Sequence, residues 1–161
     1  MLLIEQETTM SSVGTQAQNA YVAPTAGQLA AARDIVARFA EKWDKPSADA
    51  LRDLMHPETQ NLIPPMTAPG NREAVVEHFR DVLRRLPDLR LEVVRWAPTD
   101  DAVMIEWQAT ASVAGQPLAW SGVDRFNVRG DRIYQANVYW DTRGLAERMA
   151  AVVAKTSAGV A

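Results

Sequence analysis

The chain has 161 residues, of which 47% are hydrophobic, and its formal net charge is -3 at pH 7. This length and apolar content suit one domain with a hydrophobic core. An acidic chain without a Lys/Arg cluster is poorly suited to nucleic acid or to an anionic membrane, so we expect neither partner. The chain has no cysteine, which excludes disulfides, thiol nucleophiles and thiolate metal sites.

The two ends of the chain look unlike its middle. Residues 1–24 are rich in Gln, Thr, Ser and Ala and offer little to bury, which predicts a mobile tail. Met1 to Ile4 is followed at once by Glu5, so we expect neither a signal peptide nor a membrane span, and a cytoplasmic location. One domain is expected over residues 25–156, and residues 157–161 are expected to fray.

A first helix is predicted after Thr25. Thr25 and Gln28 have the spacing of a capping box, and apolar residues then recur at steps of three and four. The apolar edge includes Phe39 and Trp43, and Pro46 ends the pattern. These features indicate an amphipathic helix with aromatic residues near its end.

A short second helix and a strand are predicted next. Ser47 can cap a helix that reaches Met55, and His56 with Pro57 is interpreted as the turn that closes it. Residues 58–63 are then predicted to form a short strand.

A rigid loop and a third helix follow. Residues 64–70 contain three prolines and a glycine, and such a loop could form the rim of a cavity. Asn71 is expected to cap a helix that ends at Pro87. His78 lies at the border of the apolar stripe of this helix, where it is more simply a satisfied boundary residue than a catalytic base.

The second half of the chain is predicted to be a sheet. From Asp88 the apolar period changes from helical to two, and turns are expected at residues 99–101, 114–117 and 130–131. This pattern predicts an antiparallel meander of four strands. A terminal helix should follow, capped by Asp141 or Thr142.

One carboxylate lies in the predicted inward row of the sheet. In the segment LAWSGVDRFNV, alternation places Asp124 on the same face as Trp120 and Phe126. Burial without a cation raises the pKa of a carboxyl, so Asp124 could stay protonated near neutral pH and donate a hydrogen bond or a proton. The alternative is a buried Asp that backbone donors or water satisfy.

The predicted elements define an α+β fold. Three N-terminal helices should pack on a curved antiparallel sheet and form a cone with an apolar pocket at its open end. The inward residues expected there are Trp107, Trp120, Asp124, Phe126, Val138 and Trp140. Two separated histidines and the lack of a phosphate loop or dinucleotide motif lead us to expect no metal and no cofactor.

Two segments carry a resemblance to a known superfamily. VDRFNVRGDRIYQANVYWD and PPMTAPGNREAVVEHF resemble nuclear transport factor-like and SnoaL-like proteins, whose relatives include ketosteroid isomerases, polyketide cyclases and limonene epoxide hydrolase. The resemblance covers about residues 28–150 and implies the cone-shaped fold. It does not by itself imply one reaction, because this fold has both enzymes and non-enzymes.

The resemblance to ketosteroid isomerase concerns the VDRF segment. It implies that Asp124 takes the position of the protonated Asp of the oxyanion hole. The isomerase Tyr falls near Phe39, and the general-base Asp falls near Ile63 or Pro64. This sequence therefore lacks the isomerase base.

The resemblance to limonene epoxide hydrolase concerns Gln60-Asn61 and the residues that follow. It implies that Asn61 takes the position of a water-positioning Asn. The Arg and first Asp of the hydrolase triad fall on Ile105 and Trp107, and the second Asp falls on Val138. Apolar side chains cannot activate water, so the known hydrolase mechanism is not available.

Together these observations predict an isomerase or cyclase, independent of cofactors, that acts on a polyketide, terpenoid or steroid-like molecule. Asp124 would be the acid and Asn61 a second polar anchor. Alternatives are a non-catalytic ligand-binding or dimerisation module and an epoxide hydrolase-like enzyme with a changed catalytic set. A homodimer through the neutral outer sheet face is also expected. The expected substrate contacts are Phe39, Trp43, Ile63, Met66, Ile105, Trp107, Trp120, Gly122, Val138 and Trp140.

Overall fold

The computed structural model describes residues 22–99 and 101–158. The elements are, in order, α1 (Ala26–Asp44), α2 (Ala48–Arg52), β1 (Met55–Leu62), α3 (Arg72–Arg85), β2 (Arg90–Pro98), β3 (Ala102–Val113), β4 (Gln116–Arg129), β5 (Arg132–Trp140) and α4 (Thr142–Ala158). Most of the predicted tail and residues 159–161 of the predicted frayed end lie outside the described residues. Those predictions and the domain boundaries stay predictions.

The predicted helix starts are confirmed by their capping bonds. Gln28 N donates to Thr25 Oγ1 at 3.2 Å, and Thr25 N donates to Gln28 Oε1 at 2.7 Å, which completes the capping box. Asn71 Oδ1 accepts from the third residue of α3 at 3.0 Å. Asp141, rather than Thr142, caps α4 and accepts from Gly144 N at 2.8 Å. Each bond satisfies an amide that the helix leaves unpaired.

The sheet has five strands in the order β1-β5-β4-β3-β2. The predicted antiparallel meander of β2 to β5 is confirmed. The expectation of a wholly antiparallel sheet is corrected by β1, which pairs with β5 in parallel. No hairpin joins these two strands, and the long connection between them allows the parallel direction.

The turn predicted at His56 is part of β1 instead. The second helix already ends at Arg52, and β1 begins at Met55. Pro57 explains the difference, because the residue before a proline is disfavoured in the helical region and favoured in an extended one. The His56 ring packs edge-on against Tyr134 of β5, with 5.6 Å between ring centroids.

The end of β5 nearest its hairpin reverses the predicted faces. The register shifts between Asn127 and Val128, so that Ile133 pairs with Val128 and is buried. Strict alternation along the last strand predicts Tyr134 on the inward face with Val138 and Trp140. Tyr134 instead lies under the guanidinium of Arg129, with Arg129 Cζ 3.4 Å from the ring centroid. A bulge adds one residue to one strand and thereby inverts the alternation beyond it.

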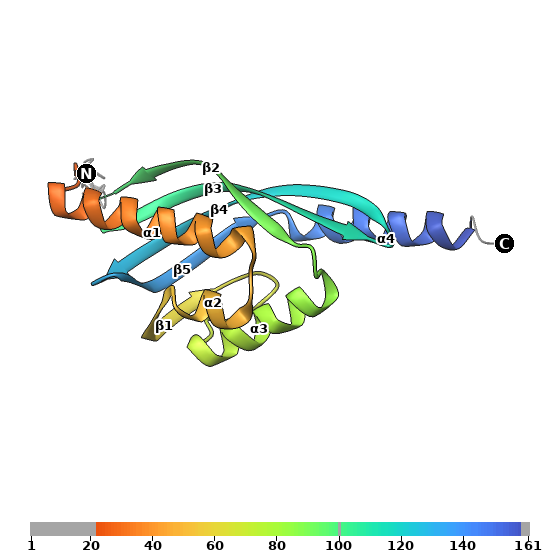
Figure 1. Ribbon diagram of the computed structural model, residues 1–161, viewed down its shortest axis with the longest axis horizontal. Coiled ribbons are helices and arrows are strands. Elements are labelled where there is room, and N and C mark those ends of the chain that lie inside the picture. The colour runs from red at the N-terminus through yellow and green to blue at the C-terminus, as the bar shows by residue number, and fades with distance from the viewer. Residues whose placement is uncertain (1–21, 100, 159–161) are drawn as a thin grey trace, which may run out of the picture.

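The helices are distributed around the sheet. Figure 1 shows α1 along one face of the sheet, α2 and α3 close to β1, and α4 leaving β5 and projecting beyond the strands. The main core joins α1 to the inner faces of the strands through residues such as Ile35, Phe39, Ile105 and Phe126. The strand predicted at residues 58–63, between the second and third helices, is confirmed as β1, which starts three residues earlier than predicted. Within the described ranges, no helix combines the length and apolar character needed to span a bilayer.

Candidate ligand-binding site

A cavity of about 570 Å³ lies between the helices and the inner face of the sheet. Its volume falls within the range of roughly 300–1,000 Å³ that is usual for small-molecule sites. The lining comes from every helix and every strand and is mostly apolar. Its residues with polar side chains, tryptophans aside, are Asn61, His78, Arg85, Asp124 and Thr142.

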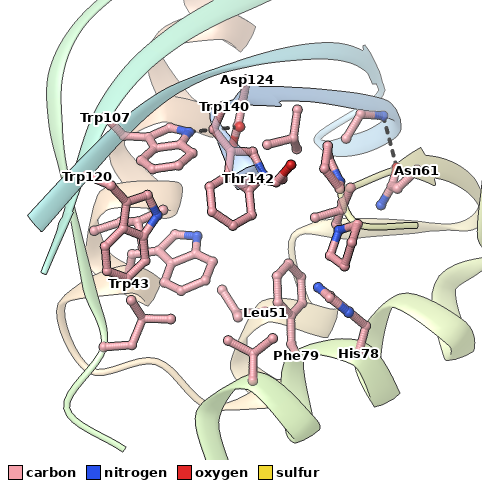
Figure 2. A pocket seen from close by; sticks show the side chains of 18 of the residues that line it. Trp43, Leu51, Asn61, His78, Phe79, Trp107, Trp120, Asp124, Trp140 and Thr142 are labelled. Atoms are coloured by element: carbon pink, nitrogen blue, oxygen red, sulfur yellow. Dashed lines mark hydrogen bonds between the residues drawn. The ribbon is translucent and has the colours of Figure 1, made fainter. Parts of the chain in front are cut away.

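Asp124 is the buried carboxyl of this cavity. The alternation along β4 turns it inward beside Phe126, and it is 5% exposed. Trp107 Nε1 donates a hydrogen bond of 2.8 Å to Asp124 Oδ1, as Figure 2 shows. Burial raises the pKa of Asp124 from 3.8 to about 7, and the bond from Trp107 opposes this rise. A substantial fraction of Asp124 is therefore protonated at neutral pH.

The bond from Trp107 also determines where the proton of Asp124 resides. An indole N–H can only donate, so Asp124 Oδ1 must accept in both protonation states. The acid proton is therefore on Oδ2. Among the described residues, Trp107 has the only side chain that donates to Asp124. This arrangement leaves the Oδ2–H available to a ligand in the cavity.

Gly122 makes room for the indole of Trp107. The two residues are paired across β3 and β4, and a Cβ atom at Gly122 would lie 2.3 Å from Trp107 Cζ2. The indole crosses over Gly122 toward Asp124, two residues further along β4. Gly122 was predicted to contact substrate, but it lies beneath the indole of Trp107 and is not part of the cavity lining.

Two other predicted contacts also lie outside the lining. Ile105 is fully buried in the core and is paired with Asp124 across the strands. Met66 packs against a second apolar cluster near α3, and its Cε lies over Gly70. The predicted residues that do line the cavity are Phe39, Trp43, Asn61, Ile63, Trp107, Trp120, Asp124, Val138 and Trp140.

Asn61 joins β1 to β5. Its Oδ1 accepts from Thr59 Oγ1 at 2.8 Å and from Ala136 N at 2.9 Å, and its Nδ2 lies 3.3 Å from Met55 Sδ. Both lone pairs of Oδ1 are thus engaged. Asn61 can still donate through its amide, but it has no free acceptor with which to orient a water.

Aromatic rings form much of the wall. The rings of Trp120 and Trp140 lie 6.4 Å apart with an interplanar angle of 31°, and Trp43 meets Phe79 edge-on at 5.6 Å. In Figure 2 these rings surround the cavity. Within residues 22–99 and 101–158, the indole N–H groups of Trp43, Trp120 and Trp140 have no hydrogen-bond partner. They are available as donors to a ligand.

Sequence reasoning missed several lining residues. His78 and Arg85 of α3 reach the cavity, although His78 was interpreted as a boundary residue. Their spacing of seven residues, with Val82 between them, places them on one helix face and could have indicated a shared role. The first turns of α4 also contribute Thr142, Leu145, Ala146 and Met149. Their spacing is helical, but the sequence did not show which surface this helix covers.

The fold and the cavity define a nuclear transport factor-like pocket protein, in which helices close the concave side of a curved sheet. The match to a known family is more specific. This chain belongs to the SnoaL-like domain family, whose profile matches residues 36–136. No functionally curated protein matches the chain.

Solved structures confirm the fold. AclR, described as a putative hydroxylase from Streptomyces galilaeus, has a TM-score of 0.66 and 18% identity, covering 81% of this chain and 92% of that one. A putative SnoaL-like polyketide cyclase from Jannaschia sp. CCS1 has a TM-score of 0.64 and 16% identity, covering 73% and 90%. TerC, co-crystallised with polyporic acid, has a TM-score of 0.63 and 16% identity, covering 74% and 97%. At these identities the likeness concerns the fold alone.

Proposed function

We propose that this protein is an isomerase or cyclase, independent of cofactors, that acts on a hydrophobic small molecule with Asp124 as its acid. The observation that carries the proposal is a carboxyl with a raised pKa in the wall of a largely apolar cavity of about 570 Å³. A neutral acid in such a site can donate to an oxygen that gains charge during reaction, and the low polarity around it strengthens that bond.

The polar groups of the cavity favour a ligand rich in acceptors. Protonated Asp124, the amide of Asn61 and three unpaired indole N–H groups are all donors. Carbonyl oxygens would match these donors, and flat rings would stack on the tryptophans. Among the three expected classes, a polyketide-like ketone fits this set best. Two structural neighbours, one named as a putative polyketide cyclase and one crystallised with polyporic acid, also support a polyketide-like ligand.

A direct test uses 2-tetralone, an apolar fused-ring ketone with acidic C–H groups beside its carbonyl. Binding is measured by tryptophan fluorescence, and enolisation by deuterium uptake from D₂O with proton NMR. Asp124→Asn should lower the uptake rate about 10²-fold while the fluorescence titration changes little, because the amide keeps the bond from Trp107 but has no acid proton. Asp53→Asn, on the exposed surface after α2, is the matched control. Full uptake by Asp124→Asn would show that Asp124 is not the acid.

A non-catalytic binding module is the second candidate. Two features favour a binding module. Ile63 or Pro64 stands where ketosteroid isomerase has its general base, and the apolar residues Ile105 and Val138 stand at positions of the epoxide hydrolase triad. Binding of 2-tetralone without deuterium uptake would indicate this function. An epoxide hydrolase with a changed catalytic set is disfavoured, because Asn61 has no free acceptor for water.

We also propose a homodimer through the outer face of the sheet. Tyr139 is 58% exposed at this face, which supports an interface there. The other members of the predicted surface carry no charge, as suits pairing about a two-fold axis. The surface consists of Met104, Gln108, Thr110, Val123, Asn127, Asn137 and Tyr139.

The cytoplasmic location stays a prediction from the sequence.

A further inference from the structure

Three titratable side chains line the cavity, and they come from two elements. Asp124 belongs to β4, whereas His78 and Arg85 belong to α3. Arginine stays protonated in proteins. Asp124 and His78 are therefore the two groups of the lining that can exchange protons near neutral pH.

His78 lies across the cavity from Asp124. Asn71 fixes the start of α3, and two turns later the helix presents His78 to the cavity beside Phe79. Figure 2 shows the imidazole on the opposite side of the cavity from the Trp107–Asp124 pair. The His78 ring is half-buried and tilts against Phe79 with 5.8 Å between centroids. A ligand that fills the space between the two walls can touch both residues.

The imidazole of His78 is free to accept a proton. Neither of its ring nitrogens forms a hydrogen bond with a described residue. Asp81, one turn further along α3, is paired with Arg84 at 2.8 Å, and Glu77, the residue before His78, is paired with Arg80. Burial, followed by the charge of Arg85, lowers the pKa of His78, and Asp81 opposes this shift. Across the cavity, the group that faces it from β4 is Asp124.

We propose that His78 is the general base that works with Asp124. This inference rests on the proposed function and adds the proton acceptor that the Ile63 or Pro64 position does not supply. The two residues form an acid–base pair on opposite walls, and both are neutral before reaction. The substrate class is then a ketone with a C–H group beside its carbonyl, long enough to span the cavity.

The proton transfers balance without a cofactor. His78 takes a proton from the carbon beside the carbonyl, and the electron pair of that C–H bond forms a carbon–carbon double bond. The carbonyl π pair moves to oxygen, which takes the proton from Asp124 Oδ2 and gives an enol. In an isomerisation, the substrate also has a carbon–carbon double bond next to that carbon, so that imidazolium returns its proton to the far carbon of the resulting dienol and the enol O–H returns its proton to Asp124. In a cyclisation, the enol carbon instead attacks a second carbonyl, whose oxygen takes the proton from His78, while the enol O–H returns its proton to Asp124 as the first carbonyl forms again.

The test follows deuterium uptake into 2-tetralone with the full, untagged chain. His78→Ala should slow uptake about 10²-fold or more, and added imidazole should restore part of the rate, because it supplies a base in the space that the side chain leaves. A merely structural His78 would not give this rescue. His56→Ala is the matched control, since His56 packs against Tyr134 and is not part of the cavity lining. It should keep the rate of the unchanged protein.

Each outcome separates this inference from the proposed function. Uptake that persists in His78→Ala but falls in Asp124→Asn overturns the base role and leaves the acid role intact. Binding of 2-tetralone with no uptake by the unchanged protein overturns the base role and indicates a binding module. If circular dichroism shows that His78→Ala is unfolded, His78→Gln replaces it. This variant keeps a polar side chain without a base, and full uptake by it overturns the proposal equally.

Discussion

Trp107 and Asp124 are diagonal neighbours on adjacent strands, joined by a hydrogen bond of 2.8 Å from Nε1 to Oδ1. Trp107 pairs with Gly122 and not with Asp124, so its ring must cross the glycine to reach the carboxyl. Diagonal pairs are within reach of aromatic side chains. This relationship connects the aromatic wall to the acid, and it determines which carboxyl oxygen faces a ligand.

Trp107→Phe should raise the pKa of Asp124 above about 7, because it removes the one interaction that opposes the effect of burial. The loss of the bond and of part of the ring should also lower the free energy of unfolding by about 1–3 kcal/mol. Carboxyl carbon NMR measures the pKa, and urea titration measures stability. Trp96→Phe on β2 is the control, and an unchanged pKa in Trp107→Phe would contradict the assignment.

Asp124→Asn should remove a pH dependence of stability. The folded pKa of about 7 lies above the ordinary value of 3.8, so between these pH values the unfolded chain releases a proton that the folded chain keeps. This group therefore lowers stability as pH rises from about 4 to 7, by about 4 kcal/mol in total, and its effect is constant above that range. Urea titrations at several pH values should show the variant gaining stability relative to the unchanged protein as pH rises. A constant difference would contradict the raised pKa.

Gly122→Ala should displace the indole of Trp107, since the new Cβ would lie 2.3 Å from Cζ2. We expect a loss of about 1–3 kcal/mol in the free energy of unfolding and a further rise in the pKa of Asp124. Gly27→Ala in α1 is the matched control, where the nearest atom to a new Cβ is Thr25 Oγ1 at 4.0 Å. It should be neutral or slightly stabilising. Equal effects of the two substitutions would contradict the packing role of Gly122.

Asn61→Ala should lower the free energy of unfolding by about 1–3 kcal/mol, because it leaves the buried Ala136 N–H without its side-chain acceptor, while the Thr59 hydroxyl keeps Tyr134 O as an acceptor at 3.0 Å. A double-mutant cycle with Thr59→Ala should show coupling, since the two side chains are bonded at 2.8 Å. Urea titration of the four proteins gives the coupling energy. Strictly additive effects would show that Asn61 does not act through Thr59.

Tyr139→Asp should convert the proposed homodimer to a monomer, because it places a like charge on both sides of a two-fold interface. Sedimentation at roughly tens of micromolar suits an interface of standard size. Glu147→Gln, on the exposed side of α4, is the control and should leave the assembly unchanged. A monomer for the unchanged protein at this concentration would contradict the proposal.

Local patterns in the sequence determined much of the architecture. The capping residues Thr25 and Asn71 marked helix starts because a cap bonds to amides only three positions away. The alternation along β4 placed Asp124 inward because successive side chains of a strand point to opposite faces. That alternation was also enough to predict a raised pKa, since desolvation depends mainly on burial.

Contacts between distant parts of the chain decided the rest. The bulge that buries Ile133, the bond from Asn61 to Ala136 and the reach of Trp107 over Gly122 all depend on how strands are paired. His78 became a cavity residue only because α3 packs against α2 and β1 beside the cavity, which its own helical periodicity could not reveal. Sequence patterns therefore determined which face each side chain takes. The tertiary structure decided which faces meet, because pairing and packing depend on residues that are far apart in the chain.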